Sequence, residues 1–124
     1  MRDFRELQVW QKSHRLTLDI YKATQSFPQE ERYGLRSQIR QSSISIGTYI
    51  AEGAAKITRP EFACILQIAL GVASEFEYEL LLAHDLGYLA IEQHQQLTER
   101  AIEVKKMLTG LIQYLYGSKT GTDG

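Results

Sequence analysis

Three carboxylates close together in the chain, Glu75, Glu77 and Glu79, have a spacing that could do acid–base chemistry. Two neighbouring carboxylates can exchange a proton with a substrate when their environments separate their pKa values. The simpler interpretation is ionic, because Glu75 and Glu79 are one helical turn apart and could pair with arginines of a facing helix. We favour the ionic interpretation and predict structural salt bridges for Glu52, Glu75 and Glu79.

A row of basic residues offers a second kind of chemistry. Arginines recur at four-residue intervals from position 32 to position 40, and a helix through this region would place them on one face. Such a row can bind the phosphates of a nucleic acid, although no aromatic residues interleave with it to stack on bases. It can equally pair with acidic residues across the bundle or across a boundary between subunits, and both interpretations stay open. The candidate nucleic-acid-binding or partner-binding residues are Arg32, Arg36, Arg40, Lys56 and Arg59.

Residues that could support other chemistry lack the required spacing. The Glu-x-x-His motif of di-iron bundles does not occur, and His14, His84 and His94 fall on three different segments. The single cysteine, Cys64, has no second cysteine with which to build a zinc site, and the glycines are too far apart for a phosphate-binding loop. We therefore predict no catalytic residue, no bound metal, no cofactor and no small-molecule substrate.

Four amphipathic segments must position these residues. Apolar side chains recur at steps of three and four over residues 6–26, 29–55, 58–84 and 90–116. Pro28 ends the first segment, Thr58 with Glu61 forms a capping box at the start of the third, and Gly87 suits the turn before the fourth. The matched lengths and short connections predict an all-α, antiparallel up-down-up-down four-helix bundle. Residues 1–116 would form this single domain, and residues 117–124 a flexible tail.

The second and third segments are apolar on more than one face. A four-helix bundle needs only one apolar stripe per helix, so the additional apolar surface is expected to contact another copy of the chain. Small residues in these segments would let a neighbouring backbone come close. The candidate residues of this oligomer interface are Ile44, Gly47, Ala51, Cys64, Ile68 and Gly71.

The overall composition restricts location and partners. The formal net charge of −1 lacks the basic excess of most nucleic-acid-binding proteins, although it leaves room for a local basic patch. A single cysteine and the absence of a secretory or membrane-spanning segment predict a cytoplasmic protein without a membrane partner.

Short motifs along most of the chain resemble the bacterial four-helix-bundle family that includes the 23S rRNA intervening-sequence protein. They occur in the family's order and comprise residues 4–14 (FRELQVWQKSH), 33–40 (YGLRSQIR), 50–53 (IAEG), 61–62 (EF), 68–71 (IALG), 75 (E) and 86–89 (LGYL). The resemblance implies a non-catalytic homo-oligomer, usually a pentamer. Of the chain's polar residues, it singles out Arg36, Arg40, Glu52 and Lys56 as candidates.

The family is also similar to the accessory variability determinant of diversity-generating retroelements, a pentameric barrel that binds a reverse transcriptase and nucleic acid. Two functions follow as expectations. The first is an oligomeric module that binds RNA, DNA, or a reverse transcriptase or other ribonucleoprotein. The second is a structural or regulatory assembly protein with protein partners only.

Overall fold

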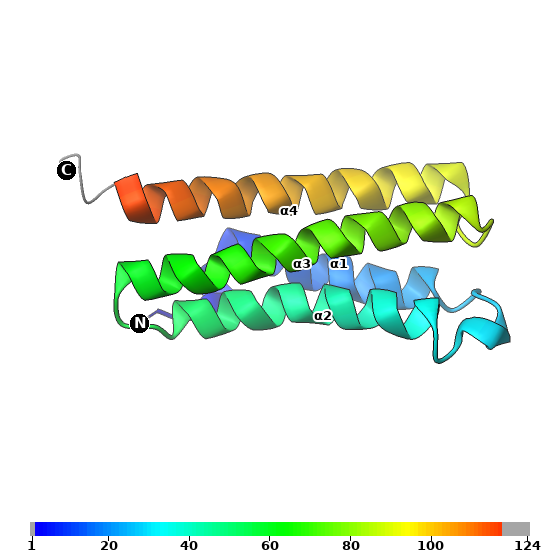
Figure 1. Ribbon diagram of the computed structural model, residues 1–124, viewed down its shortest axis with the longest axis horizontal. Coiled ribbons are helices and arrows are strands. Elements are labelled where there is room, and N and C mark those ends of the chain that lie inside the picture. Colours follow the sequence, from blue (N-terminus) through cyan, green and yellow to red (C-terminus); the bar gives the residue numbers. More distant parts are fainter. Residues whose placement is uncertain (1, 118–124) are drawn as a thin grey trace.

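The computed structural model describes residues 2–117, which form four long helices lying side by side (Figure 1). They are α1 (Gln8–Ala23), α2 (Leu35–Ala54), α3 (Arg59–Asp85) and α4 (Ile91–Gly117), and two short 3-10 helices occupy Phe4–Glu6 and Gln29–Glu31. Each long helix packs against the next in sequence, and α1 also contacts α4. The predicted antiparallel up-down-up-down four-helix bundle is confirmed.

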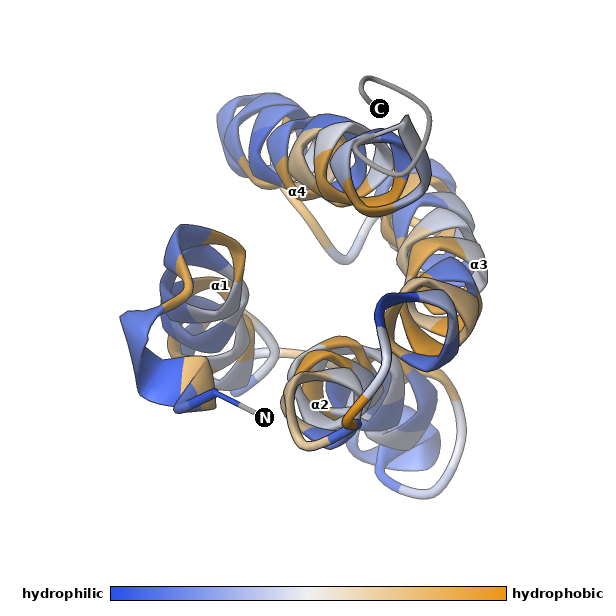
Figure 2. Cartoon of the chain, turned by 90° about the vertical axis from the view of Figure 1, so that its left-hand side faces the viewer, coloured by the Kyte–Doolittle hydropathy of each residue, from blue (hydrophilic) through white to orange (hydrophobic). Residues whose placement is uncertain are grey.

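The core is built from the apolar stripes that the sequence displays. Figure 2, viewed along the bundle, shows the hydrophobic sides of the helices turned toward a common centre. Ile20, Ile39, Leu66, Phe76 and Leu108, which come from all four helices, have no exposed surface. Burying a side chain of this size stabilises the fold by about 1.5–3 kcal/mol, so these stripes account for the architecture.

The second helix begins later than the sequence suggests. Pro28 and the glutamates after it favour a helix from Gln29, but only one 3-10 turn forms there, and α2 starts at Leu35 after a break at Gly34. The Glu31 carboxylate accepts a hydrogen bond from the Leu35 backbone N–H at 2.9 Å and so caps α2. A Cβ on Gly34 would lie 2.7 Å from Glu31 Oε1, so a side chain at this position would displace the capping carboxylate.

The Glu31 cap is held by the other connection at the same end of the bundle. Tyr88, in the turn between α3 and α4, donates a hydrogen bond from its hydroxyl to Glu31 Oε2 at 3.0 Å. This bond raises the pKa of the Tyr88 hydroxyl above its ordinary value, because the proton is held by a carboxylate. The turn also contains Gly87 with a φ of +85°, as its position in the sequence predicted.

At the other end of the bundle, the predicted Thr58 cap is confirmed, with the Glu61 carboxylate accepting from the Thr58 hydroxyl at 3.1 Å rather than from the Thr58 backbone N–H. Thr58 Oγ1 accepts a hydrogen bond from the Glu61 backbone N–H at 3.2 Å and begins α3. α4 extends through Gly117, the first residue of the predicted tail, and residues 118–124 lie outside the described part of the chain. None of the helices within residues 2–117 combines the length and apolar character needed to span a membrane.

α2 and α3 approach each other closely at Gly53, one of the small residues of the second segment that the sequence predicts to let a neighbouring backbone come near. A Cβ on Gly53 of α2 would lie 3.0 Å from Phe62 of α3, so the two helices pack tightly there. Gly47 has ordinary space toward Trp10, at 3.6 Å, and Gly71 has no atom within 4 Å. Close packing inside the bundle therefore explains Gly53, whereas Gly71 is open on the outer face of α3.

Candidate nucleic-acid interface and the acidic pocket beside it

The three predicted arginines line one surface groove. Arg32, Arg36 and Arg40 lie around a depression of about 380 Å³ between the end of α1 and the start of α2, and we call it the arginine groove. Arg32 precedes α2 and lies in the turn after the 3-10 helix, so the expected single helix face does not hold the row. The groove contains no carboxylate, which leaves its positive charge uncompensated.

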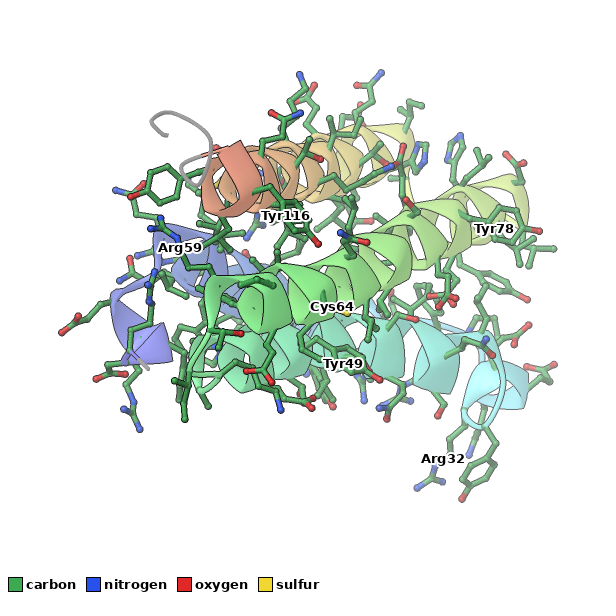
Figure 3. All side chains as sticks on the ribbon, turned by 60° about the vertical axis from the view of Figure 1, so that its left-hand side comes forward. Arg32, Tyr49, Arg59, Cys64, Tyr78 and Tyr116 are labelled. Carbon is green, nitrogen blue, oxygen red and sulfur yellow. The ribbon has the colours of Figure 1, made fainter. Side chains whose placement is uncertain are left out.

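Two tyrosines complete the arginine groove. Tyr21 comes from α1 and Tyr33 from the turn before α2, and the Tyr33 ring is 88% exposed. The Arg32 guanidinium lies 5.6 Å from the centre of the Tyr33 ring, and Figure 3 shows Arg32 projecting away from the side of the bundle near the start of α2. The expectation that no aromatics accompany the arginines is wrong, because it considered spacing along the chain and missed Tyr33 next to Arg32.

Arg40 is the most firmly held of the three cations. Its Nε donates to Thr24 Oγ1 at 2.8 Å, its Nη2 donates to the Tyr21 carbonyl at 3.0 Å, and its guanidinium lies 4.4 Å from the centre of the Tyr21 ring. Burial lowers the pKa of Arg40, and the nearby positive charge of Arg36 lowers it further. α1 therefore fixes Arg40 in place.

The other two basic candidates lie at the opposite end of the bundle. Lys56 and Arg59 follow the 20 residues of α2, a helix of about 30 Å at 1.5 Å per residue. The Arg59 guanidinium lies 5.0 Å from the centre of the Tyr114 ring, and Figure 3 shows it at the end away from Arg32. Within one chain, the five candidates therefore form two separate groups.

A second depression lies on the other flank of the start of α2. We call it the acidic pocket: it has a volume of about 730 Å³ and is lined by Gly34, Leu35 and Gln38 from the α2 side, and by Ser74, Glu75, Tyr78, Glu79 and Leu82 from α3. Glu79 is only 7% exposed, whereas Glu75 is exposed. The pocket thus has a buried carboxylate inside, an exposed one beside it, and largely apolar walls.

The buried carboxylate is electrostatically unsatisfied. Burial raises the pKa of Glu79 above its ordinary value and Glu75 raises it further, while hydrogen bonds from Ser42 and Gln38 offset part of the rise. Glu79 Oε1 is fully enclosed and has no hydrogen-bond partner within residues 2–117. A buried polar atom without a partner is destabilising, so the pocket is electrostatically incomplete in a single chain.

The predicted salt bridges of the acidic residues do not form within one chain. Among residues 2–117, the carboxylate of this region that is paired is Glu77, whose Oε1 lies 3.0 Å from Lys105 of α4. Within residues 2–117, Glu52, Glu75 and Glu79 have no ion pair with an arginine of α2. Arg36 and Arg40 line the groove on the α1 side, Glu75 and Glu79 belong to α3, and Glu52 is exposed near the end of α2. Pairing across a subunit boundary stays a prediction.

The candidate interface residues lie on two outer surfaces. One group lines an apolar groove of about 440 Å³ between α1 and α2, beside Trp10 and His14, and comprises Ile44, Gly47 and Ala51. The other group is exposed on α3 and comprises Cys64, Ile68 and Gly71. Two separate apolar surfaces suit a contact between unlike faces of neighbouring copies, and the oligomer itself stays a prediction.

All three histidine rings stack on another aromatic ring. His14 stacks on Trp10 with ring centres 4.9 Å apart, and His84 stacks on His94 at 4.6 Å. His84 Nδ1 also lies 3.2 Å from the Leu89 carbonyl oxygen. Within residues 2–117, no three of the histidine, cysteine and acidic side chains are placed to hold a metal ion together.

Comparisons with known proteins identify relatives of this bundle. The sequence profile described as "23S rRNA-intervening sequence protein" matches residues 5–110. A solved structure of a protein with unknown function from the S23 ribosomal protein family of Bacteroides thetaiotaomicron VPI-5482 is 30% identical in sequence, with a TM-score of 0.78. The match covers 85% of this chain and 95% of that one. No curated protein matches the sequence.

Proposed function

The chain belongs to the 23S rRNA-intervening sequence protein family, and from this premise we propose that it is a non-catalytic homo-oligomer that binds nucleic acid. The arginine groove carries the proposal, because it gathers three cations and two tyrosines without a carboxylate. Guanidinium groups bind phosphates through paired hydrogen bonds, and an exposed aromatic ring such as Tyr33 stacks on an unpaired base. Single-stranded RNA is the ligand that suits this combination.

The oligomeric part of the proposal rests on the exposed apolar side chains. Ile44 is 39% exposed and Ile68 is 44% exposed, on two different surfaces of one small bundle. A closed assembly would cover them and repeat the Arg32 end of the bundle once per copy. Such repetition strengthens binding, because each further contact forms within the same complex. The family resemblance favours a pentamer and a cytoplasmic ribonucleoprotein or reverse transcriptase as the partner that carries the nucleic acid.

The second expectation, an assembly protein with protein partners only, is favoured by the charge distribution. The net charge is −1, and the Arg32 and Arg59 groups lie at opposite ends of α2. A duplex or a long single strand would need a continuous basic path between them. The two functions therefore differ in whether purified protein retains RNA.

Fluorescence anisotropy with a labelled single-stranded RNA distinguishes the two functions. We expect binding at low salt that weakens as salt rises, with a log–log slope that drops by about 1 for each phosphate-binding arginine removed. Arg32→Gln should reduce this slope, and Tyr33→Ala should weaken binding through lost stacking. Arg15→Gln, an exposed arginine on α1, is the matched control. Absence of binding at low salt, or equal losses in Arg32→Gln and Arg15→Gln, would overturn the nucleic-acid proposal.

A further inference from the structure

We infer that the acidic pocket is completed by a second copy of this chain, whose Arg36 enters the pocket and pairs with Glu79 and Glu75. The inference rests on the oligomeric part of the proposed function and does not depend on nucleic-acid binding. It names the residue pair that holds neighbouring copies together.

The pocket side is incomplete within one chain. Glu79 is 7% exposed, its Oε1 has no hydrogen-bond partner, and no lysine or arginine lines the pocket. A carboxylate taken out of water without a cation is strongly destabilised, whereas a cation placed beside it restores the charged form. Glu75 and Gln38, at the same pocket, can share hydrogen bonds with an incoming guanidinium.

The arginine side is also incomplete within one chain. Arg36 is half-buried in the arginine groove, has no ion pair within residues 2–117, and lies near enough to Arg40 to lower its pKa. Arg40 is already held by Thr24 and Tyr21, and Arg32 lies beyond the start of α2. Arg36 is therefore the groove cation on α2 that is free to accept a carboxylate partner.

The two incomplete sites lie at the same height on the bundle. Gly34, Leu35 and Gln38 border the acidic pocket, while Arg36 and Arg40 border the arginine groove, so both occupy the first turns of α2 on opposite flanks. Copies related by rotation about an axis parallel to their bundles keep every residue at its own height. A ring of such copies can bring Arg36 of one copy to the pocket of the next, while Arg32 and Tyr33, which precede α2, remain at the open end of the groove.

The same side-by-side arrangement also pairs the apolar surfaces. α3 runs antiparallel to α2, and the contact of Gly53 with Phe62 places the start of α3 beside the end of α2. Ile68 and Gly71 therefore lie near the height of Gly47 and Ile44. Because Gly71 has no atom within 4 Å, a neighbouring helix can approach α3 closely there. Charge then meets opposite charge near one end of the interface, and apolar surface meets apolar surface near the other.

A double-mutant cycle on the complete chain tests the pairing. Subunit dissociation would be followed by native mass spectrometry and sedimentation for the wild type, Arg36→Gln, Glu79→Gln and the double variant. We expect each single change to weaken assembly at least tenfold, and the double change to add little, because both remove the same contact. Arg15→Gln and Glu99→Gln, which change exposed charges on α1 and α4, are matched controls and should leave assembly unchanged.

Directed cross-linking gives a second readout that does not depend on Glu79 variants folding. In a Cys64→Ser background, Arg36→Cys combined with Glu75→Cys places two thiols on opposite flanks of one bundle, so a disulfide can form only between copies. We expect mild oxidation to yield a covalent ladder that ends at the subunit number. Arg15→Cys combined with Glu75→Cys should yield no ladder.

The outcomes separate the inference from the proposed function. An intact oligomer with additive or absent effects in the cycle, and no ladder, would overturn the Arg36–Glu79 pairing while leaving the oligomer standing. A wild-type protein that is monomeric at micromolar concentration would overturn both the pairing and the oligomeric part of the proposed function. RNA binding is an independent readout for Arg32→Gln and Tyr33→Ala only, because Arg36 also lines the arginine groove and its loss should affect both assembly and RNA binding. A pocket that binds a free arginine-rich peptide as tightly in the Arg36→Gln variant as in the wild type would point to a foreign basic partner and against the second copy.

Discussion

The two flanks of α2 differ in whether their charged side chains are exposed or buried. On the α1 flank, Arg32 and Arg36 keep their charges near water, whereas on the α3 flank Glu79 is buried with an unpaired oxygen. The lengths of the neighbouring helices explain the difference. α1 has 16 residues and ends at Ala23, which leaves the start of α2 partly uncovered, while α3 has 27 residues and reaches Asp85 to cover the other flank. The start of α2 thus has a basic groove on one flank and a pocket with a buried carboxylate on the other.

The largest effect is expected where the α2–α3 contact is tightest. Gly53→Leu should lower the free energy of unfolding by about 2–3 kcal/mol, because the side chain would overlap Phe62, which lies 3.0 Å from the position of the first added carbon. Gly47→Ala, on the α1 flank, meets Trp10 at 3.6 Å and should stabilise by about 0.5–1 kcal/mol through helix propensity. Denaturant unfolding of both variants checks this. Equal losses in the two would show that the flanks do not differ in packing.

A smaller effect is expected at the cap that precedes both flanks. Glu31→Ala removes the acceptor for the Leu35 N–H and for the Tyr88 hydroxyl, and we expect a loss of about 1–2 kcal/mol in unfolding free energy. Tyr88→Phe removes one of the two bonds and should have a smaller effect. Thermal unfolding of the pair measures the ratio. A larger loss in Tyr88→Phe than in Glu31→Ala would contradict the capping role of Glu31.

The smallest effect is a pH dependence confined to the α3 flank. The folded protein binds a proton at Glu79 more tightly than the unfolded chain does, because burial raises the pKa of Glu79 above the ordinary value of 4.5. The contribution of protonated Glu79 to the free energy of unfolding is fully present below pH 4.5. It is lost as the pH rises through the raised pKa of the folded state. Unfolding of dilute, dissociated protein across this pH range should show the loss, and Glu79→Gln should remove it. Glu99→Gln, at an exposed position, should keep the wild-type profile.

Assembly is expected to shift the pKa of Glu79 in the opposite direction. If Arg36 of a second copy occupies the acidic pocket, the carboxylate is held in its charged form, and the pH-dependent loss should shrink as protein concentration rises. A pH profile that does not change with concentration, in a protein that does assemble, would show that the pocket is not at the contact between copies.

Periodicity predicted the fold because every helix buries a continuous apolar stripe. Local chemistry predicted the Thr58 cap and the Gly87 turn, since both depend on residues close in sequence. It failed at the start of α2, where the cap is Glu31, supported by Tyr88 from a distant turn. A contact between residues so far apart in the sequence cannot be predicted from the pattern of neighbouring residues.

The candidate sites were predicted only in part, because they too depend on contacts between residues that are distant in the sequence. The arginines of the groove were identified from their spacing, but the turn at Gly34 and the arrival of Tyr21 from α1 decide how they meet. The sequence predicted a salt bridge for Glu79, because it does not show that α3 extends past the start of α2 and buries this carboxylate away from the arginines. Helix lengths, set by distant caps, therefore determine which charges are buried.

Glu31 has a consequence beyond capping. Its two carboxylate oxygens join the connection between α1 and α2 to the connection between α3 and α4. Local opening of one connection breaks the bond that steadies the other, so both should open as one cooperative unit, with amide hydrogens that exchange together. Arg32 and Tyr33 lie on that unit, and their mobility is therefore coupled to Tyr88, which is far away in the sequence and belongs to the other connection.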